Sequence, residues 1–178
     1  MSNRLTKEKW VQHGLETLEK KGFGALKAEP LAKALKVSRG SFYWHFNDIN
    51  VFRNDVLELW RQHTTLEVIE AIEEFSSKPE RLKALMQRAF NSRRDLERAV
   101  RAWSIRSPDA AKVVAAVDSE RIDYLGKLLE ADGVSNARLR SKATFLYWAY
   151  LGQTMMMNSG SDQFGDTEIE ELIASIRG

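Results

Sequence analysis

The decamer from Val37 to Phe46, V-S-R-G-S-F-Y-W-H-F, constrains this chain more than any other stretch. On a helix that turns about 100° per residue, Phe42 and Phe46 share one face and Trp44 points the opposite way. Gly40 costs about 1 kcal/mol of helix propensity relative to alanine, which is explained if another molecule approaches the backbone there. The pattern predicts a short helix that is anchored by two phenylalanines and enters a groove. The alternative is a capped turn of core helix.

The segment before the decamer supports the groove interpretation. A short apolar-periodic run from Leu31 to Val37 opens near Pro30, a residue suited to the first turn of a helix. Ser38 is the expected N-cap of the next helix, with its hydroxyl accepting from the amide of Ser41. Two short helices joined by a turn of three or four residues are typical of the helix-turn-helix, whose second helix enters the major groove of DNA.

These residues carry a family resemblance. The run L-A-K-A-L-K-V-S-R-G-S-F-Y-W-H-F, followed by N-D, resembles the N-terminal domain of the TetR/AcrR family of transcriptional regulators, and Y-x-H-F is its most specific part. The motif resemblance covers roughly residues 5–60; beyond them only helix order and length are similar. It implies an all-α fold of about nine helices. A helix-turn-helix DNA-binding domain (1–48) would be joined by a long fourth helix to a ligand-binding and dimerisation domain (49–178).

The sequence departs from the family pattern at three places. Ala28 and Glu29 stand where relatives open their second helix with a hydroxyl or basic residue, and Glu29 would repel phosphate. Lys36 replaces the usual glycine of the turn, so a positive φ there would cost about 1 kcal/mol. Ile49 replaces a lysine that contacts the DNA backbone in many relatives. The fold is expected to survive all three, whereas the operator sequence and affinity stay open.

Helical periodicity extends over the rest of the chain, and no segment shows a strand pattern with hairpin turns. The helices are expected at 6–21, 30–37, 38–46, 49–75, 79–91, 95–106, 108–131, 135–158 and 167–177. The predicted caps include Thr6, Asp48, the Ser107-Pro108-Asp109 start and a capping box of Thr167 with Glu170.

Charge is uneven along the chain. Residues 1–50 hold nine basic and five acidic side chains, although the whole chain has a net charge of only +2. A basic N-terminal part fits a phosphate-binding domain, although a solvated helix surface would give the same excess. The predicted DNA-binding residues are Arg39, Gly40, Ser41, Tyr43, Trp44, His45, Lys27 and Lys36. Among them Tyr43 and His45 are expected to flank the groove and touch phosphate.

The C-terminal part holds Met and aromatic residues that fill a bundle core and also line adaptable pockets. The resemblance implies a small-molecule site among them. The predicted ligand-binding residues are His63, Met86, Phe90, Trp103, Tyr124, Phe145 and Trp148. A satisfied core histidine is the alternative for His63, and ordinary core is the alternative for most of the others. Arg106 and Arg121 are interpreted as surface salt-bridge residues, with an anionic ligand as the alternative.

Residues 145–151 are apolar around the whole helix, which requires partners on more than one side. Phe145 and Trp148 are expected to face the protomer's own core, while small side chains meet a second copy. Together with the apolar stripe of the last helix this predicts a homodimer built on a four-helix bundle. The predicted interface residues are Ala149, Gly152, Ile169, Leu172, Ile173 and Ile176.

Other classes of protein lack support in the sequence. Cysteine is absent, which excludes disulfides and thiolate metal sites. No phosphate-binding loop, nucleophile elbow or zinc-protease motif is present, so neither an enzyme, a metal site nor a cofactor is predicted. No secretory signal appears, and the longest apolar run is shorter than a membrane span, so a cytoplasmic protein without a membrane partner is expected.

The sequence therefore predicts a homodimeric, ligand-responsive transcriptional regulator, a repressor as is most frequent in the family. Its partners would be double-stranded DNA with a palindromic operator, a second copy of itself and an unknown small molecule. The alternative is a helical architectural or interaction protein of TetR-like shape that binds no specific DNA, which Glu29 and Ile49 favour.

Overall fold

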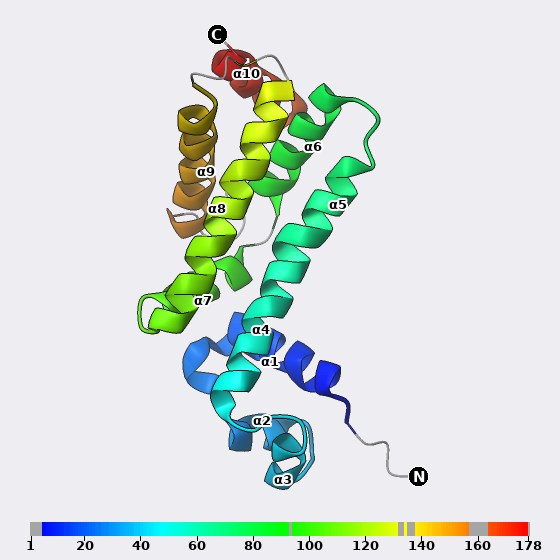
Figure 1. Ribbon diagram of the computed structural model, residues 1–178, viewed down its shortest axis with the longest axis vertical. Coiled ribbons are helices and arrows are strands. Elements are labelled where there is room, and N and C mark those ends of the chain that lie inside the picture. Colours follow the sequence, from blue (N-terminus) through cyan, green and yellow to red (C-terminus); the bar gives the residue numbers. More distant parts are fainter. Residues whose placement is uncertain (1–4, 93, 132–133, 135–137, 157–163, 178) are drawn as a thin grey trace. The chain divides into compact units, whose positions relative to one another are not determined.

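The computed structural model describes residues 5–92, 94–131, 134, 138–156 and 164–177, and all regular structure in these ranges is helical (Figure 1). The α-helices are α1 (Lys7–Lys21), α2 (Ala28–Ala34), α3 (Arg39–Tyr43), α4 (Ile49–Arg61), α5 (Glu67–Glu73), α6 (Lys78–Asn91), α7 (Asp95–Ser104), α8 (Pro108–Ala131), α9 (Leu139–Met156) and α10 (Asp166–Arg177). A 3-10 turn, η1 (Phe23–Ala25), follows α1, and a π-helical turn, η2 (Gln62–Leu66), joins α4 to α5. The all-α prediction is confirmed.

The chain divides into two compact units. Unit 1 comprises residues 1–63 and 95–115, and unit 2 comprises residues 64–94 and 116–178. This division differs from the predicted boundary after residue 48, because α1 packs against both α4 and α7 and thereby draws them into unit 1. The assignment of DNA binding and ligand binding to two domains stays a prediction.

Unit 1 is organised around α1. Thr6 is its N-cap as predicted and accepts from the amide of Lys9 at 3.4 Å. Gly14 lets α4 approach closely, since a Cβ at this position would lie 2.5 Å from the Phe52 ring. The fully buried side chains around this contact are mostly large: Trp10, Leu18, Leu26, Leu31, Phe42, Phe46, Phe52, Val56, Leu57, Trp60 and Val100.

A buried carboxylate also links α4 to α7 within unit 1. Glu97 is buried and accepts from the indole of Trp60 at 3.3 Å and from the guanidinium of Arg101 at 2.9 Å. A buried charge is stable only when it is paired and hydrogen-bonded. Glu97 therefore specifies which face of α7 turns toward α4.

Unit 2 has a second hydrophobic core of buried residues from α5, α6, α8, α9 and α10. Its members are Ile72, Leu82, Met86, Phe90, Tyr124, Leu128, Leu129, Val134, Ala143, Leu146, Ile169 and Ile173. Helix α10 packs on α6, and in Figure 1 it is the red helix near the C-terminus. The predicted capping box of Thr167 with Glu170 is wrong, because α10 begins at Asp166; a capping box forms instead between Ser77 and Glu80 at the start of α6.

The predicted uninterrupted helix over residues 49–75 is also corrected. Its middle is the π turn η2, which adds a residue to one turn of the helix. In unit 2 the Arg121 guanidinium donates from Nε to Thr65 Oγ1 at 2.9 Å and from Nη2 to Thr64 Oγ1 at 2.8 Å. These bonds from α8 hold one side of the turn.

None of the described helices combines the length and the apolar composition that a membrane-spanning segment requires.

Candidate nucleic-acid interface

The turn between α2 and α3 has the geometry of a helix-turn-helix. Lys36 takes a φ of 56°, the left-handed conformation that favours glycine. The amide of Val37 donates to the carbonyl of Ala32 at 3.0 Å and closes the turn. A left-handed residue with a side chain costs about 1–2 kcal/mol, so the charge of Lys36 is retained at the expense of backbone strain.

Aromatic residues anchor α3 to the rest of unit 1. Phe42 and Phe46 are buried as predicted, and their rings lie 4.9 Å apart. Phe42 also contacts Trp10 of α1 at 5.4 Å and Phe52 of α4 at 5.2 Å, both edge to face. Because three helices supply rings to one cluster, the buried face of α3 is fixed and its opposite face is left at the surface.

The opposite face carries most of the residues predicted to contact DNA. We define the recognition surface as Arg39, Gly40, Ser41, Tyr43 and Trp44. Trp44 is 75% exposed and lies just beyond the last residue of α3. Such exposure of an indole is costly in water, so this surface is suited to a partner that covers it.

Two of these side chains are preorganised by each other. The guanidinium of Arg39 lies 5.6 Å above the Tyr43 ring, and its Nη2 donates to the Tyr43 hydroxyl at 3.4 Å. The hydrogen bond that Arg39 donates to the Tyr43 hydroxyl raises the pKa of Arg39 further, so the guanidinium is positively charged at any physiological pH. A cation held on an aromatic ring loses little rotamer freedom when it binds a base edge or a phosphate.

Gly40 lies beside them with open space around its Cα. A Cβ placed there would meet only Ser38 Oγ, at 3.7 Å, so packing within the chain does not require glycine. The absence of a side chain instead leaves the backbone accessible to another molecule. The predicted side-chain cap is wrong: Ser38 is the N-cap residue, but the amide of Ser41 bonds its carbonyl oxygen at 3.0 Å and not its hydroxyl.

The remaining predicted contacts lie around the recognition surface. Lys27 and Lys36 are exposed, at the N-cap of α2 and in the turn. His45 is half-buried, and its Nε2 lies 2.8 Å from the carbonyl oxygen of Leu5. Glu29 is exposed in the first turn of α2 and acts electrostatically on Arg39, so the recognition surface also carries one nearby negative charge.

Residues 11–50 match the family model described as bacterial regulatory proteins, tetR family. The match covers most of α1, all of α2 and α3 and the turn between the last two, which are the elements that build and support the recognition surface. This part of the chain is a TetR-type domain. The resemblance seen in the Y-x-H-F motif is thereby confirmed.

Solved structures share the fold of this chain over nearly its whole length. E. coli NemR in its reduced form matches 96% of this chain and 95% of its own, with a TM-score of 0.78 and 20% identity. A transcriptional regulator from Rhodococcus matches 98% and 95%, with a TM-score of 0.75 and 14% identity. The superantigen PfiT matches 95% of this chain and 94% of its own, with a TM-score of 0.71 and 22% identity. No curated protein sequence matches the chain significantly.

The residues predicted to bind a ligand are distributed over several environments. Met86, Phe90 and Tyr124 are buried together in the core of unit 2. Trp103 belongs to unit 1, where it stacks on Phe23 with ring centroids 4.7 Å apart. His63 is half-buried in the π turn. Only the first three therefore share one hydrophobic cluster.

Two further members of that predicted set face solvent. Phe145 is 68% and Trp148 is 65% exposed, so the expectation that they face the protomer's own core is wrong. The side of α9 that is buried carries Ala143, Leu146, Tyr147 and Thr154 instead. Tyr147 is held there because its hydroxyl donates to Asp118 Oδ1 at 2.6 Å.

The exposed side of α9 forms an apolar stripe. We define the α9 stripe as Phe145, Trp148, Ala149, Gly152, Met155 and Met156, all exposed and spaced three or four residues apart along one side of the helix. Between Ala143 and Met156 the sequence contains no charged residue. The two α9 residues predicted for a dimer interface, Ala149 and Gly152, lie within this stripe.

The four interface residues predicted on the last helix lie elsewhere. Ile169 and Ile173 are buried in the core of unit 2, and Leu172 and Ile176 pack partly against it. Ile169 and Ile173 therefore pack within the protomer, whereas Leu172 and Ile176 are only partly buried, and their place in a dimer interface stays a prediction. The periodicity of the stripe was correct, but its partner is α6 of the same chain.

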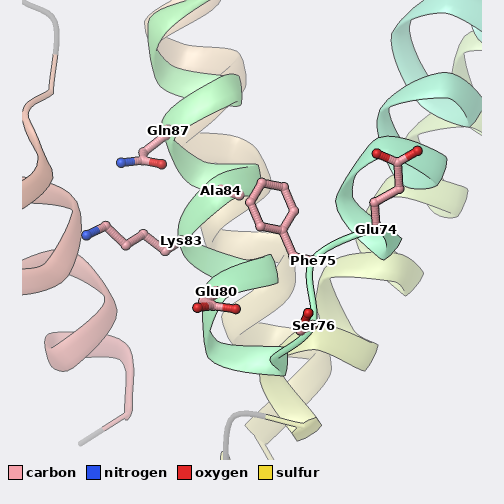
Figure 2. Close-up of a pocket in the computed structure, with 7 residues that line it drawn as sticks. All are labelled: Glu74, Phe75, Ser76, Glu80, Lys83, Ala84 and Gln87. Carbon is pink, nitrogen blue, oxygen red and sulfur yellow. The ribbon is translucent and has the colours of Figure 1, made fainter.

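A shallow hollow of about 350 Å³ lies where the chain passes from α5 to α6 (Figure 2). Figure 2 shows the Phe75 ring beside Ala84, while Lys83 and Gln87 point away from it. Lys83 bonds Glu170 at 2.5 Å and Gln87 bonds Asp166, so both serve to dock α10. The hollow contains none of the predicted ligand residues, and we assign it no ligand.

Sequence reasoning undervalued Arg121. It was interpreted as a surface salt-bridge residue, but besides Thr64 and Thr65 it donates to the Tyr147 hydroxyl at 3.4 Å. The guanidinium thus lies in a half-buried polar network between α8, α9 and the π turn. Its position near an apolar stripe was the available signal. Within the described residues no group of three or more His, Asp or Glu side chains is placed to hold a metal ion.

Proposed function

We propose that this chain is a homodimeric DNA-binding transcriptional regulator of the cytoplasm, a repressor whose affinity for a palindromic operator falls when a small molecule binds unit 2. The observation that carries DNA binding is the recognition surface on a TetR-type domain. An exposed arginine and an unobstructed glycine on one short helix, with an exposed indole directly after it, match the chemistry of major-groove base edges. Arginine reads guanine, and apolar groups contact the thymine methyl.

The α9 stripe supports the homodimer. Its exposed aromatic and methionine side chains are the residue types enriched in the centres of protein interfaces, and no charge interrupts them. A two-fold axis at this stripe would give two recognition surfaces, which on DNA would be separated by about 34–36 Å or a multiple of it. We therefore propose a second copy of the chain as its partner.

The core of unit 2 supports a ligand site. Met86, Phe90 and Tyr124 lie in one cluster, and methionine with aromatic residues forms adaptable pockets. A ligand that prefers one conformation of this unit lowers DNA affinity by its differential affinity for the two states. The residues of α5 and the π turn, which continue directly into α4 of unit 1, provide the covalent route for such an effect.

The second candidate function is an interaction or architectural protein without specific DNA binding. The exposed carboxylate of Glu29, which acts electrostatically on Arg39, favours it, because a negative charge there would oppose phosphate. The two functions differ in salt dependence, since every phosphate neutralised adds about −0.9 to the slope of log affinity against log salt concentration. A slope close to zero would favour the second candidate.

Selection of duplexes from a random DNA pool, followed by sequencing, tests the proposed function. The selected site is then measured, base by base, with Arg39→Ala and Lys36→Gly variants. Arg39→Ala should relax preference at one base pair per half-site by about 1–3 kcal/mol. Lys36→Gly keeps the left-handed backbone but removes the charge, so it should weaken all sequences alike and reduce the salt slope. Equal, uniform losses in both variants would contradict the assigned roles, and a pool without enrichment would contradict specific DNA binding.

A further inference from the structure

Helix α3 is too short to hold its own position. It has five residues, far fewer than an isolated helix needs to be stable in water. The rings of Phe42 and Phe46 set how deeply it is buried. Hydrophobic contact is non-directional, so these rings leave the orientation of the following residues less well defined. A hydrogen bond at the end of α3, which is directional, would therefore define the orientation of these residues.

His45 supplies that contact. Its Nε2 lies 2.8 Å from the carbonyl oxygen of Leu5, and the ring is half-buried. A carbonyl oxygen only accepts, so Nε2 carries the hydrogen and donates it. Leu5 directly precedes Thr6, the N-cap of α1. We call residues 39–46 the recognition segment. The bond thus joins the C-terminal end of this segment to the start of α1, across forty residues of sequence.

A second residue at the start of α1 contacts the same region. The amine of Lys7 lies 2.8 Å from Asp55 Oδ2 in α4 and 5.7 Å from the centroid of the Phe46 ring. The first residues of α1 therefore contact both the end of the recognition segment and α4. The His45–Leu5 bond therefore lies where the start of α1, the residues after α3 and α4 meet.

We propose that His45 is a positioning residue for DNA recognition: its Nε2–H holds Leu5 and thereby fixes the C-terminal end of the recognition segment, in place of binding a phosphate. The inference rests on the proposed DNA-binding function and changes the role that the sequence predicted for His45. The Nε2 proton is already donated within the chain, so donating it to a phosphate would release Leu5. The imidazole then contributes geometry to DNA binding and no counterion release.

Two substitutions separate the two roles. In His45→Gln the side-chain amide nitrogen reaches about as far as Nε2 and keeps a donor, without any possibility of positive charge. His45→Ala removes the donor. Affinities of the full-length variants for the DNA selected by the unmodified protein, and for single-base variants of that DNA, are measured over a range of salt concentrations.

We expect His45→Gln to bind within about twofold of the unmodified protein and His45→Ala to bind about tenfold more weakly, the usual effect of one lost hydrogen bond. The salt slope should be unchanged in both. If His45→Gln loses as much affinity as His45→Ala while its thermal unfolding is unchanged, the proposal is overturned. A slope that is smaller in magnitude by about 0.9 in either variant would identify a phosphate contact and overturn it as well.

A measurement without DNA tests the bond itself. Nitrogen-15 NMR of the imidazole in the free protein should show the hydrogen on Nε2 of His45, and a hydrogen on Nδ1 alone would overturn the proposal. This result does not depend on the operator. If the unmodified protein selects no DNA sequence, the proposed function fails, whereas the NMR measurement still decides whether His45 holds Leu5.

Discussion

The recognition surface and the α9 stripe both expose large aromatic side chains, but they differ in what surrounds them. On the recognition surface Trp44 stands among Arg39, Ser41 and Tyr43, which carry a charge and two hydroxyl groups. On the α9 stripe Trp148 stands among phenylalanine, methionine, alanine and glycine only. An exposed tryptophan is thus common to both surfaces. The polarity of the side chains around it distinguishes one surface from the other.

The difference indicates two kinds of partner. A polyanion with hydrogen-bonding base edges is matched by an arginine and hydroxyl groups beside an indole. A surface without any charge is matched only by another apolar surface, because an ionic partner would lose its hydration without compensation. We therefore propose DNA as the partner of the recognition surface and a second copy of the chain as the partner of the α9 stripe.

The largest expected effect concerns the buried aromatic cluster behind the recognition surface. Phe46→Ala should lower the free energy of unfolding of unit 1 by about 3–5 kcal/mol, because the ring is 1% exposed and leaves a cavity. Ile105→Ala, at a position that is 83% exposed in the same unit, is the control and should change stability by less than about 0.5 kcal/mol. Urea titration followed by tryptophan fluorescence compares them, and similar small losses would place Phe46 outside the core.

A charge on the α9 stripe should dissociate the dimer without unfolding the protomer. A Cβ at Gly152 meets nothing within 4 Å, so Gly152→Glu fits the free helix. In a dimer the carboxylate would be buried, and we expect the dimer to weaken by roughly 100-fold or more, about 2.7 kcal/mol. Ala174→Glu, on the exposed side of α10, is the control. Sedimentation velocity at micromolar concentration measures the oligomeric state of each protein. If the unmodified protein sediments as a monomer, a second copy of the chain is not the partner of the α9 stripe.

The smallest effect concerns Tyr124, a buried aromatic of unit 2. Burial and a hydrogen bond from its hydroxyl to Glu73 Oε1, at 2.8 Å, raise its pKa above the ordinary value of 10.0. The folded state then keeps a proton that the unfolded state releases, so this stabilisation is complete below about pH 10 and is lost as pH rises above it.

The pH dependence of stability that we expect from Tyr124 is tested by comparing Tyr124→Phe with the unmodified protein. The decline in the free energy of unfolding between pH 9 and 11.5 should be shallower in the variant, as measured by urea titration at each pH. Tyr43→Phe, which changes an exposed tyrosine of the recognition surface, is the control and should follow the unmodified protein. An identical decline in all three would show that Tyr124 ionises equally in both states.

Most of residues 1–63 of unit 1 was predictable because the signals there are local. The caps at Thr6 and Asp48, the Ser38 start of α3 and the pair Phe42–Phe46 each act within a few residues. The left-handed φ of Lys36 was anticipated only as a condition, because the family resemblance implies a glycine at this place in the turn. What sequence reasoning missed there is the bond from His45 to Leu5, because no periodicity relates residues forty positions apart.

In unit 2 the helices were predictable but their faces were not. Helix α9 is apolar around most of its circumference, so its sequence gives no preferred side. The buried side is chosen by partners distant in sequence, such as the Tyr147 hydroxyl bonding Asp118, and the exposed side is what remains. The stripe on α10 had a clear side, but nothing in it distinguished α6 of the same chain from a second protomer.

The sequence by itself determined the helical class, most helix boundaries and the helix-turn-helix, since capping, propensity and amphipathic period act over one or two turns. Only the tertiary structure decided which apolar surfaces are buried and which polar groups meet. It brought Arg121 of α8 into contact with Thr65 of the π turn, 56 residues away in sequence, and it left Trp148 at the surface. Hydrophobic burial has no direction of its own, so the choice among apolar faces depends on the packing of the whole unit and on the few polar pairs that fit within it.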